Sequence, residues 1–149
     1  MNNKTMGKIF KKVADNLDGE RGAWEVTYKE RIMLVLTDET NNRMRIFTPI
    51  AAEEEVGTRE FKIMLEANFH SALDAKYSLY NGYIISVYTH PLQELNEEQL
   101  IDALSQVAVL ANNFGTTYSS TDLLFGVEQE ESEEKRINKS PSGKKEKGS

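Results

Sequence analysis

Two histidines are the side chains best suited to catalysis or metal binding in this sequence. His70 closes an apolar helical stripe and precedes Ser71, whereas His90 ends a strand-like segment before Pro91. Neither has a second histidine at ligand spacing, and a metal site needs several convergent ligands. We therefore expect neither histidine to be catalytic or metal-bound, and we expect no cofactor.

Other groups of polar residues have simpler explanations than chemistry. Glu53–Glu55 are consecutive, so they cannot all face one cation and predict a solvated loop. Glu97 and Glu98 suit the positive end of a helix. Residues 116–122 are rich in hydroxyl groups but have no base beside them. Neither a G-x-G-x-x-G sequence nor a P-loop occurs, so the sequence predicts a protein that is not an enzyme.

Composition limits the class of protein further. The chain has 149 residues, of which 39% are hydrophobic and 28% charged, which fits one domain with a core. It has no cysteine and no apolar run of the roughly 20 residues that cross a bilayer, and residues 1–17 lack the apolar region of a secretory signal. We therefore expect a cytoplasmic protein without a membrane partner. The net charge of −6 argues against a nucleic-acid partner.

The C-terminal residues 127–149 differ from the rest of the chain. Five glutamates between Glu128 and Glu134 precede a mostly basic stretch, and only Val127 and Ile137 are apolar. Such a segment cannot bury enough surface to offset its ordering entropy. We expect a single domain over residues 1–126 and a disordered charged tail over residues 127–149, with a weak electrostatic docking arm as the alternative.

Leu123-Leu124-Phe125 is an apolar group just before that tail. Two interpretations remain open for it. The group either packs against the core or docks a second subunit.

Hydrophobic periodicity predicts a helix over residues 5–17, ended by Gly19 and Gly22. Alternating segments then predict three strands, over residues 23–28, 31–37 and 43–50. A second helix is expected over residues 58–70, with Thr58 as its N-cap.

Asn81-Gly82 between aromatic-rich segments predicts a hairpin of residues 76–80 and 83–90, because both turn positions need positive φ. Asn96 and Gln99 form a capping-box sequence for a last helix, whose apolar seam runs to Tyr118, although Gly115 is a candidate end. The order is α-β-β-β-α-β-β-α. It predicts an α+β fold with a five-stranded antiparallel sheet and three helices.

Two of the predicted strands are apolar on both faces. Ile32, Leu34 and Leu36 alternate with Met33 and Val35. Residues 83–90 show the same pattern. Either the three helices cover both faces, or one apolar face stays open for a partner. Methionines 33, 44 and 64 suit an adaptable binding surface or an ordinary core.

Three stretches resemble a known family. The second helix reads Phe61-Lys-Ile-Met-Leu-Glu-Ala-Asn-Phe69, the hairpin ends at Thr89-His90-Pro91-Leu92, and Leu95-Asn96-Glu97-Glu98-Gln99-Leu100 opens the last helix. Together with the element order, they resemble the type III secretion chaperone fold (the CesT-like, or Tir chaperone, group). The related YbjN-like sensory-transduction-regulator group is similar. The resemblance covers roughly residues 5–118.

The resemblance implies a small acidic homodimer without enzymatic activity, which binds a largely unfolded segment of a partner polypeptide. The YbjN-like alternative implies an intracellular regulator that binds a folded partner. By analogy, the first helix and the three-stranded segment would bind the partner, with Trp24 as the main anchor, through Ile9, Phe10, Val13, Trp24, Val26, Met33 and Val35. The second helix and the hairpin would form the dimer interface, through Phe61, Met64, Leu65, Tyr77, Leu79 and Tyr80. Ordinary core packing is the alternative for both sets.

Overall fold

The computed structural model describes residues 1–120. The boundary of the folded domain at residue 126, Leu123-Leu124-Phe125 and the charged tail lie outside these described residues. Within them, three helices pack on one antiparallel sheet, in the order predicted apart from one additional strand. The helices are α1 (Asn3–Val13), α2 (Thr58–His70) and α3 (Glu97–Asn112).

The sheet has six strands rather than five, so that prediction was wrong. Its spatial order is β1-β2-β3-β4-β6-β5, with every neighbouring pair antiparallel. The strands are β1 (Asn16–Glu20), β2 (Ala23–Tyr28), β3 (Arg31–Asp38), β4 (Arg43–Ala52), β5 (Lys76–Tyr80) and β6 (Tyr83–His90).

The additional strand β1 replaces the predicted last turn of the first helix. The helix α1 ends at Val13, because Ala14 has extended backbone angles and Asp15 N–H donates to Thr27 O at 2.8 Å. Leu17, which fitted the helical stripe, instead pairs with Val26. The strand has only this one apolar side chain, so no alternation identified it; backbone pairing with β2 forms it.

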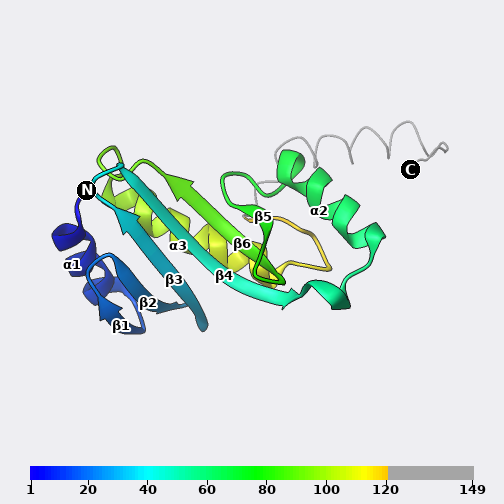
Figure 1. Ribbon diagram of the computed structural model, residues 1–149, viewed down its shortest axis with the longest axis horizontal. Helices are drawn as coiled ribbons and strands as arrows, with labels where there is room; N and C mark the ends of the chain where they lie inside the picture. The colour runs from blue at the N-terminus through cyan, green and yellow to red at the C-terminus, as the bar shows by residue number, and fades with distance from the viewer. Residues whose placement is uncertain (121–149) are drawn as a thin grey trace.

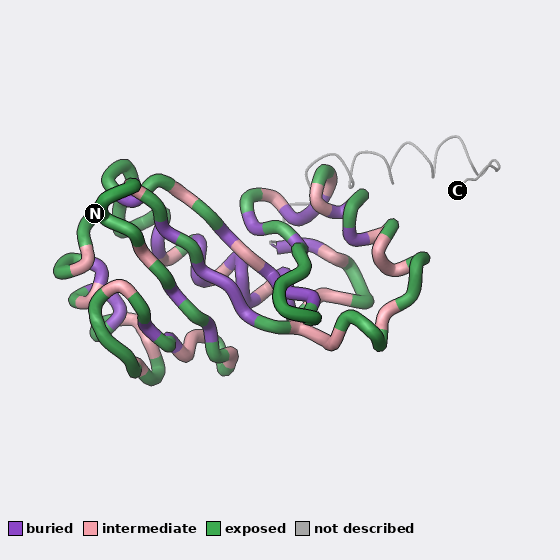
Figure 2. Tube along the Cα trace, in the orientation of Figure 1, coloured by how far each residue is buried: buried purple, intermediate pink, exposed green. Residues whose placement is uncertain are grey.

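One face of the sheet carries α1 and α3 (Figure 1). The core lies between them and the inward side chains of the central strands, as the buried segments in Figure 2 show. α3 begins at the predicted capping box, in which Asn96 and Gln99 each bond the other's backbone N–H. It ends at Asn112, before the end of the predicted seam.

The apolar seam continues past α3 as a turn. Phe114 and Tyr118 both pack edge-on against Tyr77, with ring centroids 5.9 and 6.0 Å away. The left-handed backbone of Gly115, at φ +88°, makes this turn possible, since residues with a side chain rarely adopt that conformation. Of the two predicted ends of this helix, Gly115 was therefore closer than Tyr118 to the observed end at Asn112.

At the other end of the sheet, α2 packs against β5. Gly57, not the predicted Thr58, occupies the N-cap position, and it makes no side-chain cap bond. The Asn68 side chain forms two hydrogen bonds with the Tyr77 backbone, accepting from its N–H at 2.8 Å and donating to its carbonyl at 3.2 Å. The Ala-Asn sequence that closes this helix therefore has a structural role, since Ala67 is buried beside it.

Candidate functional site

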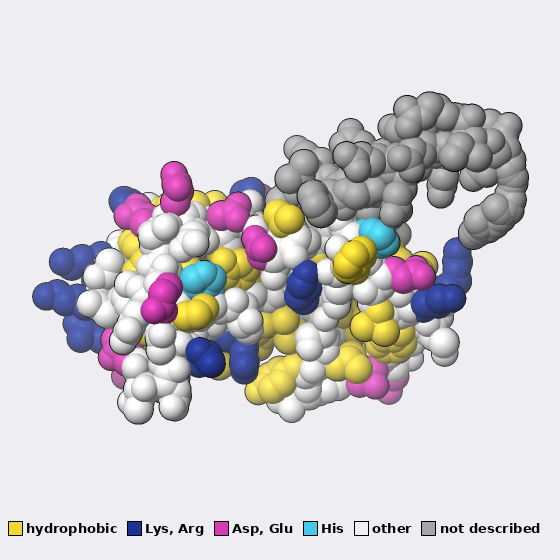
Figure 3. Space-filling view, turned by 90° about the horizontal axis from the view of Figure 1, so that it is seen from above, with side chains coloured by type: hydrophobic (Ala, Val, Ile, Leu, Met, Phe, Trp, Pro, Cys, Tyr) yellow, Lys and Arg dark blue, Asp and Glu magenta, His cyan; other side chains and the backbone are white. Residues whose placement is uncertain are grey.

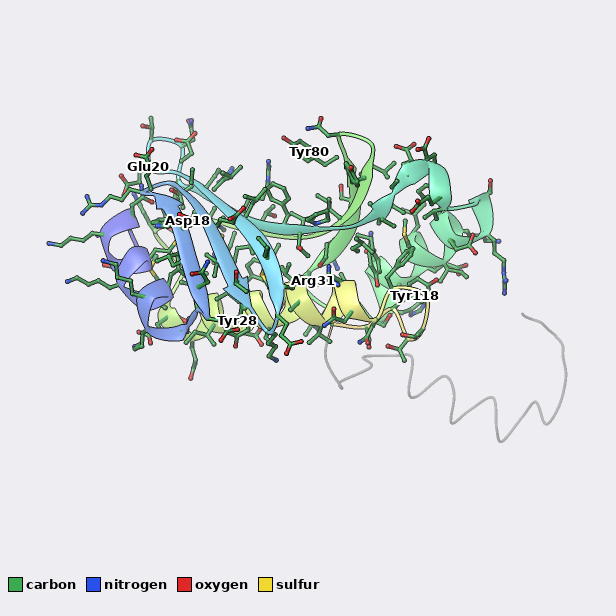
Figure 4. The ribbon with its side chains drawn as sticks, turned by 90° about the horizontal axis from the view of Figure 1, so that it is seen from below. Asp18, Glu20, Tyr28, Arg31, Tyr80 and Tyr118 are labelled. Atoms are coloured by element: carbon green, nitrogen blue, oxygen red, sulfur yellow. The ribbon has the colours of Figure 1, made fainter. Side chains whose placement is uncertain are left out.

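The sheet face opposite α3 is apolar, and no helix of residues 1–120 lies over its central strands (Figure 4). Ile32, Leu34 and Leu36 of β3 point to this open face with 54%, 39% and 41% of their surfaces exposed. Met33 and Val35, which alternate with them, are fully buried under the helices. Of the two predicted arrangements, the structure therefore shows the open apolar face.

Strand register aligns these side chains into rows across the sheet. One row runs from Leu34 to Phe47 on β4 and on to Val87 on β6. Its two ends carry opposite charges, because Glu25 pairs with Leu34 and Lys76 pairs with Val87. This row of the open face is thus an apolar strip with charged margins, which is the composition of a protein interaction surface.

A shallow hollow of about 340 Å³ lies in this face. Its wall is the aromatic pair of Phe47 and Tyr80, whose rings meet edge to face at 5.6 Å. Leu36, Arg45 and Val87 also line the hollow. Phe47 is nearly buried under Tyr80, whereas Tyr80 itself is 53% exposed. The hollow could accept one apolar side chain of a ligand beside the Arg45 guanidinium.

The first set of predicted partner-binding residues lies in the core. Trp24 of β2 packs edge-on against Phe10 of α1, with ring centroids 5.2 Å apart. Trp24 is only 4% exposed and Val13 is half-buried. Ile9, Phe10, Val26, Met33 and Val35 are buried. The structure brings all seven together as packing between α1 and the sheet, and Met44 and Met64 are also buried rather than free to adapt to a ligand.

The predicted dimer residues are divided between core and surface. Met64 and Tyr77 are buried, and Phe61 is partly buried against the core. Leu65, Leu79 and Tyr80 are exposed, at 71%, 50% and 53%. The predicted interface residues of α2, Phe61, Met64 and Leu65, therefore do not form one buried face, because this helix contacts the sheet only along its edge.

The predicted dimer interface left out two exposed aromatic residues near these positions. Phe69 of α2 is 82% exposed and Tyr83 of the hairpin is 50% exposed. The signal for Phe69 was its position: it is four residues from Leu65, so both lie on one side of α2. Figure 3 shows hydrophobic side chains at the surface of this half of the molecule.

The polar groups near the site have structural roles. The Arg31 guanidinium donates twice to Asn112 Oδ1 and once to Pro49 O, which joins β3 to the end of α3, and burial lowers its pKa. The Tyr77 hydroxyl donates to Leu110 O at 2.9 Å. Burial, and secondarily the charge of Tyr118, raises the Tyr77 pKa.

The residues first considered for catalysis are dispersed. His90 stacks on Tyr88, and its Nδ1 lies 2.8 Å from Pro91 O. His70 contacts the Phe69 ring. Glu53–Glu55 form a short exposed 3₁₀ helix. The described part of the chain contains no group of three metal-ligating side chains, and none of its helices is long and apolar enough to span a membrane.

Comparison with known proteins found similarity in structure only. No protein-family model matches the sequence, and no curated protein matches it. One similar solved structure is the type III secretion chaperone SycH of Yersinia pestis, in complex with a stable fragment of YscM2. It has a TM-score of 0.57 and 11% identity, and the match covers 76% of this chain and 98% of that chain.

Two further solved structures are similar. The HopA1–SchA chaperone–effector complex gives a TM-score of 0.53 at 11% identity, with 73% of this chain and 95% of that chain covered. The ExsC–ExsE complex gives 0.54 at 13% identity, covering 74% and 92%. At these identities the similarity concerns the fold, and it confirms the resemblance inferred from the sequence. This chain therefore has a type III secretion chaperone-like fold.

Proposed function

We propose that this chain is a non-enzymatic, chaperone-like protein that binds an extended or partly unfolded segment of a partner polypeptide. The observation that carries this proposal is the open sheet face, where Ile32, Leu34 and Leu36 stand exposed on a strand whose opposite side is core. A monomer gains nothing from exposing these side chains to water, since burying apolar area contributes about 25 cal/mol per Å². A partner that covers the strip recovers that free energy.

The geometry of the face suits an extended chain. Side chains on one face of a strand repeat about every 6.7 Å, and neighbouring strands lie about 4.8 Å apart. An extended partner segment has the same side-chain repeat, so alternate residues can contact Leu34 and Leu36 in turn. The hollow beside Phe47 and Tyr80 then holds one larger side chain. Such binding relies on area rather than on a few strong contacts, because the partner is ordered as it binds.

The three similar structures support this proposal by what they contain. SycH was solved with a fragment of YscM2, and SchA with the effector HopA1.

By the same analogy we propose that the chain forms a homodimer through the exposed side of α2 and the β5–β6 hairpin. Of the residues expected at that interface, Leu65, Leu79 and Tyr80 are at the surface, and Phe69, four residues after Leu65 on α2, is also exposed.

Partner contact through Ile9, Phe10 and Trp24 stays a prediction. These side chains are buried between α1 and the sheet, so a partner reaches most of their surface only if α1 moves. Our proposal therefore places the main contact on the open face and leaves the core set in a packing role.

The test compares an unfolded polypeptide with its folded form. Reduced and carbamidomethylated α-lactalbumin cannot refold, and we expect the chain to bind it and to ignore native α-lactalbumin in isothermal titration calorimetry. Leu34→Lys should weaken that binding at least tenfold. Thr40→Lys is the matched control, because it adds the same charge at an exposed turn beside the face.

Equal binding of the two α-lactalbumin forms, or wild-type binding by Leu34→Lys, would contradict the proposal. Preference for a folded partner through the same face would instead favour the YbjN-like regulatory role.

A further inference from the structure

A second groove lies between α1 and the β1–β2 hairpin, away from the open face. Its volume is about 430 Å³. Gly7, Leu17 and Trp24 contribute the apolar part of its lining, and Lys4, Lys8, Lys11 and Arg21 contribute four basic side chains. Asp18 and Glu20 supply two carboxylates from β1, as Figure 4 shows. The lining is thus basic overall, in a chain whose net charge is −6.

The basic charge is concentrated on α1, which has four lysines and no acidic residue. Lys12 forms an ion pair with Glu97 at 2.7 Å. Lys4, Lys8 and Lys11 are exposed and make no ion pair with any residue in 1–120. Figure 3 shows basic side chains gathered at the end of the molecule where α1 lies. Asp18 and Glu20 line the same groove, but within residues 1–120 neither forms an ion pair with these three lysines.

Gly7 lies beside the edge of the Trp24 indole, and both residues line the groove. A Cβ at Gly7 would lie 3.8 Å from Trp24 Cζ2, which is an ordinary contact, so alanine would fit there. Glycine is less favourable than alanine inside a helix. Packing therefore does not require this glycine, and it leaves the small exposed part of Trp24, 4% of that residue, in the lining of the groove beside the lysines.

The groove also adjoins a free strand edge. β1 is the outermost strand of the sheet, and four of its five residues are exposed. An edge strand offers unpaired N–H and C=O groups to an added strand. Lys4, Lys8 and Lys11 rise about 6 Å and about 4.5 Å apart along the helix axis. Alternate side chains of an extended segment repeat at about 6.7 Å, so a carboxylate at every second position can meet them.

We propose that this groove binds an acidic, extended segment of the partner polypeptide. Carboxylates of that segment face Lys4, Lys8 and Lys11, and an apolar side chain contacts the Trp24 edge beside Gly7. The inference rests on the proposed function and adds to it a chemical class of partner sequence. Charge complementarity selects an acidic segment over a neutral or basic one, and salt weakens the contact because the lysines are exposed.

Trp24 is the only tryptophan, so its fluorescence reports directly on the groove. The probe is an eight-residue peptide of alternating Glu and Val, compared with a peptide of alternating Gln and Val, both titrated into the full chain. We expect the acidic peptide to shift the Trp24 emission and to bind at least tenfold more tightly. The preference should shrink steadily between 50 mM and 500 mM salt.

Lys8→Glu combined with Lys11→Glu should abolish the binding of the acidic peptide. The matched control is Arg59→Glu with Lys62→Glu on α2, which changes the net charge equally at exposed positions outside the groove. Circular dichroism checks that both variants are folded. Equal affinity for the two peptides, or wild-type binding by the Lys8/Lys11 variant, would overturn the proposal.

Two outcomes distinguish this inference from the proposed function and from occupancy of the groove by the chain's own glutamates. If the peptides do not discriminate but unfolded α-lactalbumin still binds at Leu34, the proposed function stands and only the acidic preference fails. The competing occupant of the groove is the glutamate-rich stretch between Glu128 and Glu134 of the chain itself. If Glu130→Gln, Glu131→Gln and Glu133→Gln together shift the Trp24 emission of the free chain, the groove holds that segment and its assignment to a partner is overturned.

Discussion

The Tyr80 ring rests edge-on against the Phe47 ring, with centroids 5.6 Å apart and planes at 72°. Phe47 lies in the middle of β4, and Tyr80 lies at the tip of the hairpin, on the side of the sheet opposite α3 (Figure 4). The contact therefore fixes the hairpin tip beside the open face. One aromatic ring is nearly buried as a result, and the other stays available to a ligand.

Replacing Tyr80 by alanine tests this relationship. Loss of the aromatic pair should cost about 1 kcal/mol in the free energy of unfolding. It should also weaken binding of unfolded α-lactalbumin several-fold, because the hollow loses its wall. Urea unfolding and calorimetry measure the two effects. Tyr83→Ala is the control, since that side chain is equally exposed on the same hairpin but does not line the hollow. Identical binding by both variants would argue against a role for the hollow.

The proposed dimer has its own test in the exposed side of α2. Leu65→Lys with Phe69→Lys adds two charges where 71% and 82% of the side chains are exposed, so monomer stability should change by less than about 0.5 kcal/mol. If α2 forms the dimer interface, the variant should be monomeric by light scattering where the wild type is dimeric. Thr40→Lys is a surface control, because it adds a charge at an exposed turn outside α2 and the β5–β6 hairpin. A wild-type monomer at high concentration would end this proposal.

The sequence predicted elements well where the local pattern and the tertiary contacts agree. The hairpin is confirmed because Asn81 and Gly82 both have positive φ, at 51° and 81°. The capping box of α3 is confirmed because both of its side-chain-to-backbone hydrogen bonds are present. The strand β1 could not be predicted, because its polar sequence pairs only through the backbone.

Whether a side chain lies in the core or at the surface was less predictable than the positions of the helices and strands. Both faces of β3 are apolar, so nothing local states which face the helices cover. Leu65 and Phe69 look like the inner stripe of a helix, yet α2 packs through Met64 and Ala67. Only the position of α2 at the edge of the sheet decides this, and that position depends on contacts distant in sequence.

Gln106 is a further residue that sequence reasoning did not identify, because most of its partners come from a loop distant in sequence. Its Oε1 accepts from the N–H groups of Asp74 and Ala75 at 3.0 and 3.1 Å. Its Nε2 donates to the carboxylates of Asp74 and Asp102. The side chain is 1% exposed. Gln106→Ala should therefore destabilise the fold by about 3 kcal/mol, since it leaves two backbone donors without an acceptor.

Gln106→Glu separates shape from charge at this position. It keeps the acceptor oxygen but places a carboxylate beside Asp74 and Asp102, so the pKa of the new group is raised in the folded state. A raised folded pKa makes its contribution to stability complete below the unfolded pKa of about 4.3 and lost as pH rises. Urea unfolding from pH 4 to pH 8 should show a growing deficit against the wild type. A constant deficit would contradict the electrostatic explanation.

The buried Tyr77 hydroxyl should make the folded chain less stable in alkaline solution. Burial, and then the charge of Tyr118, raises its pKa in the folded state. Its contribution is therefore full below the unfolded pKa of about 10 and declines as pH rises above that value. Tyr77→Phe should cost about 1 kcal/mol at pH 7 through the lost bond to Leu110 O. It should also flatten the decline measured by urea unfolding between pH 9 and pH 11, whereas Tyr83→Phe should leave that slope unchanged.

Gly7→Ala separates stability from binding in the groove beside α1. Alanine at this helical position should stabilise the chain by about 1 kcal/mol, or roughly 4 °C in Tm, because its Cβ meets Trp24 at an ordinary distance of 3.8 Å. The same methyl group covers part of the indole edge. We therefore expect a more stable chain that binds the alternating Glu-Val peptide less tightly, by calorimetry and Trp24 fluorescence. Higher Tm with undiminished affinity would show that the ring takes no part in binding, and would leave the lysines as the whole of the site.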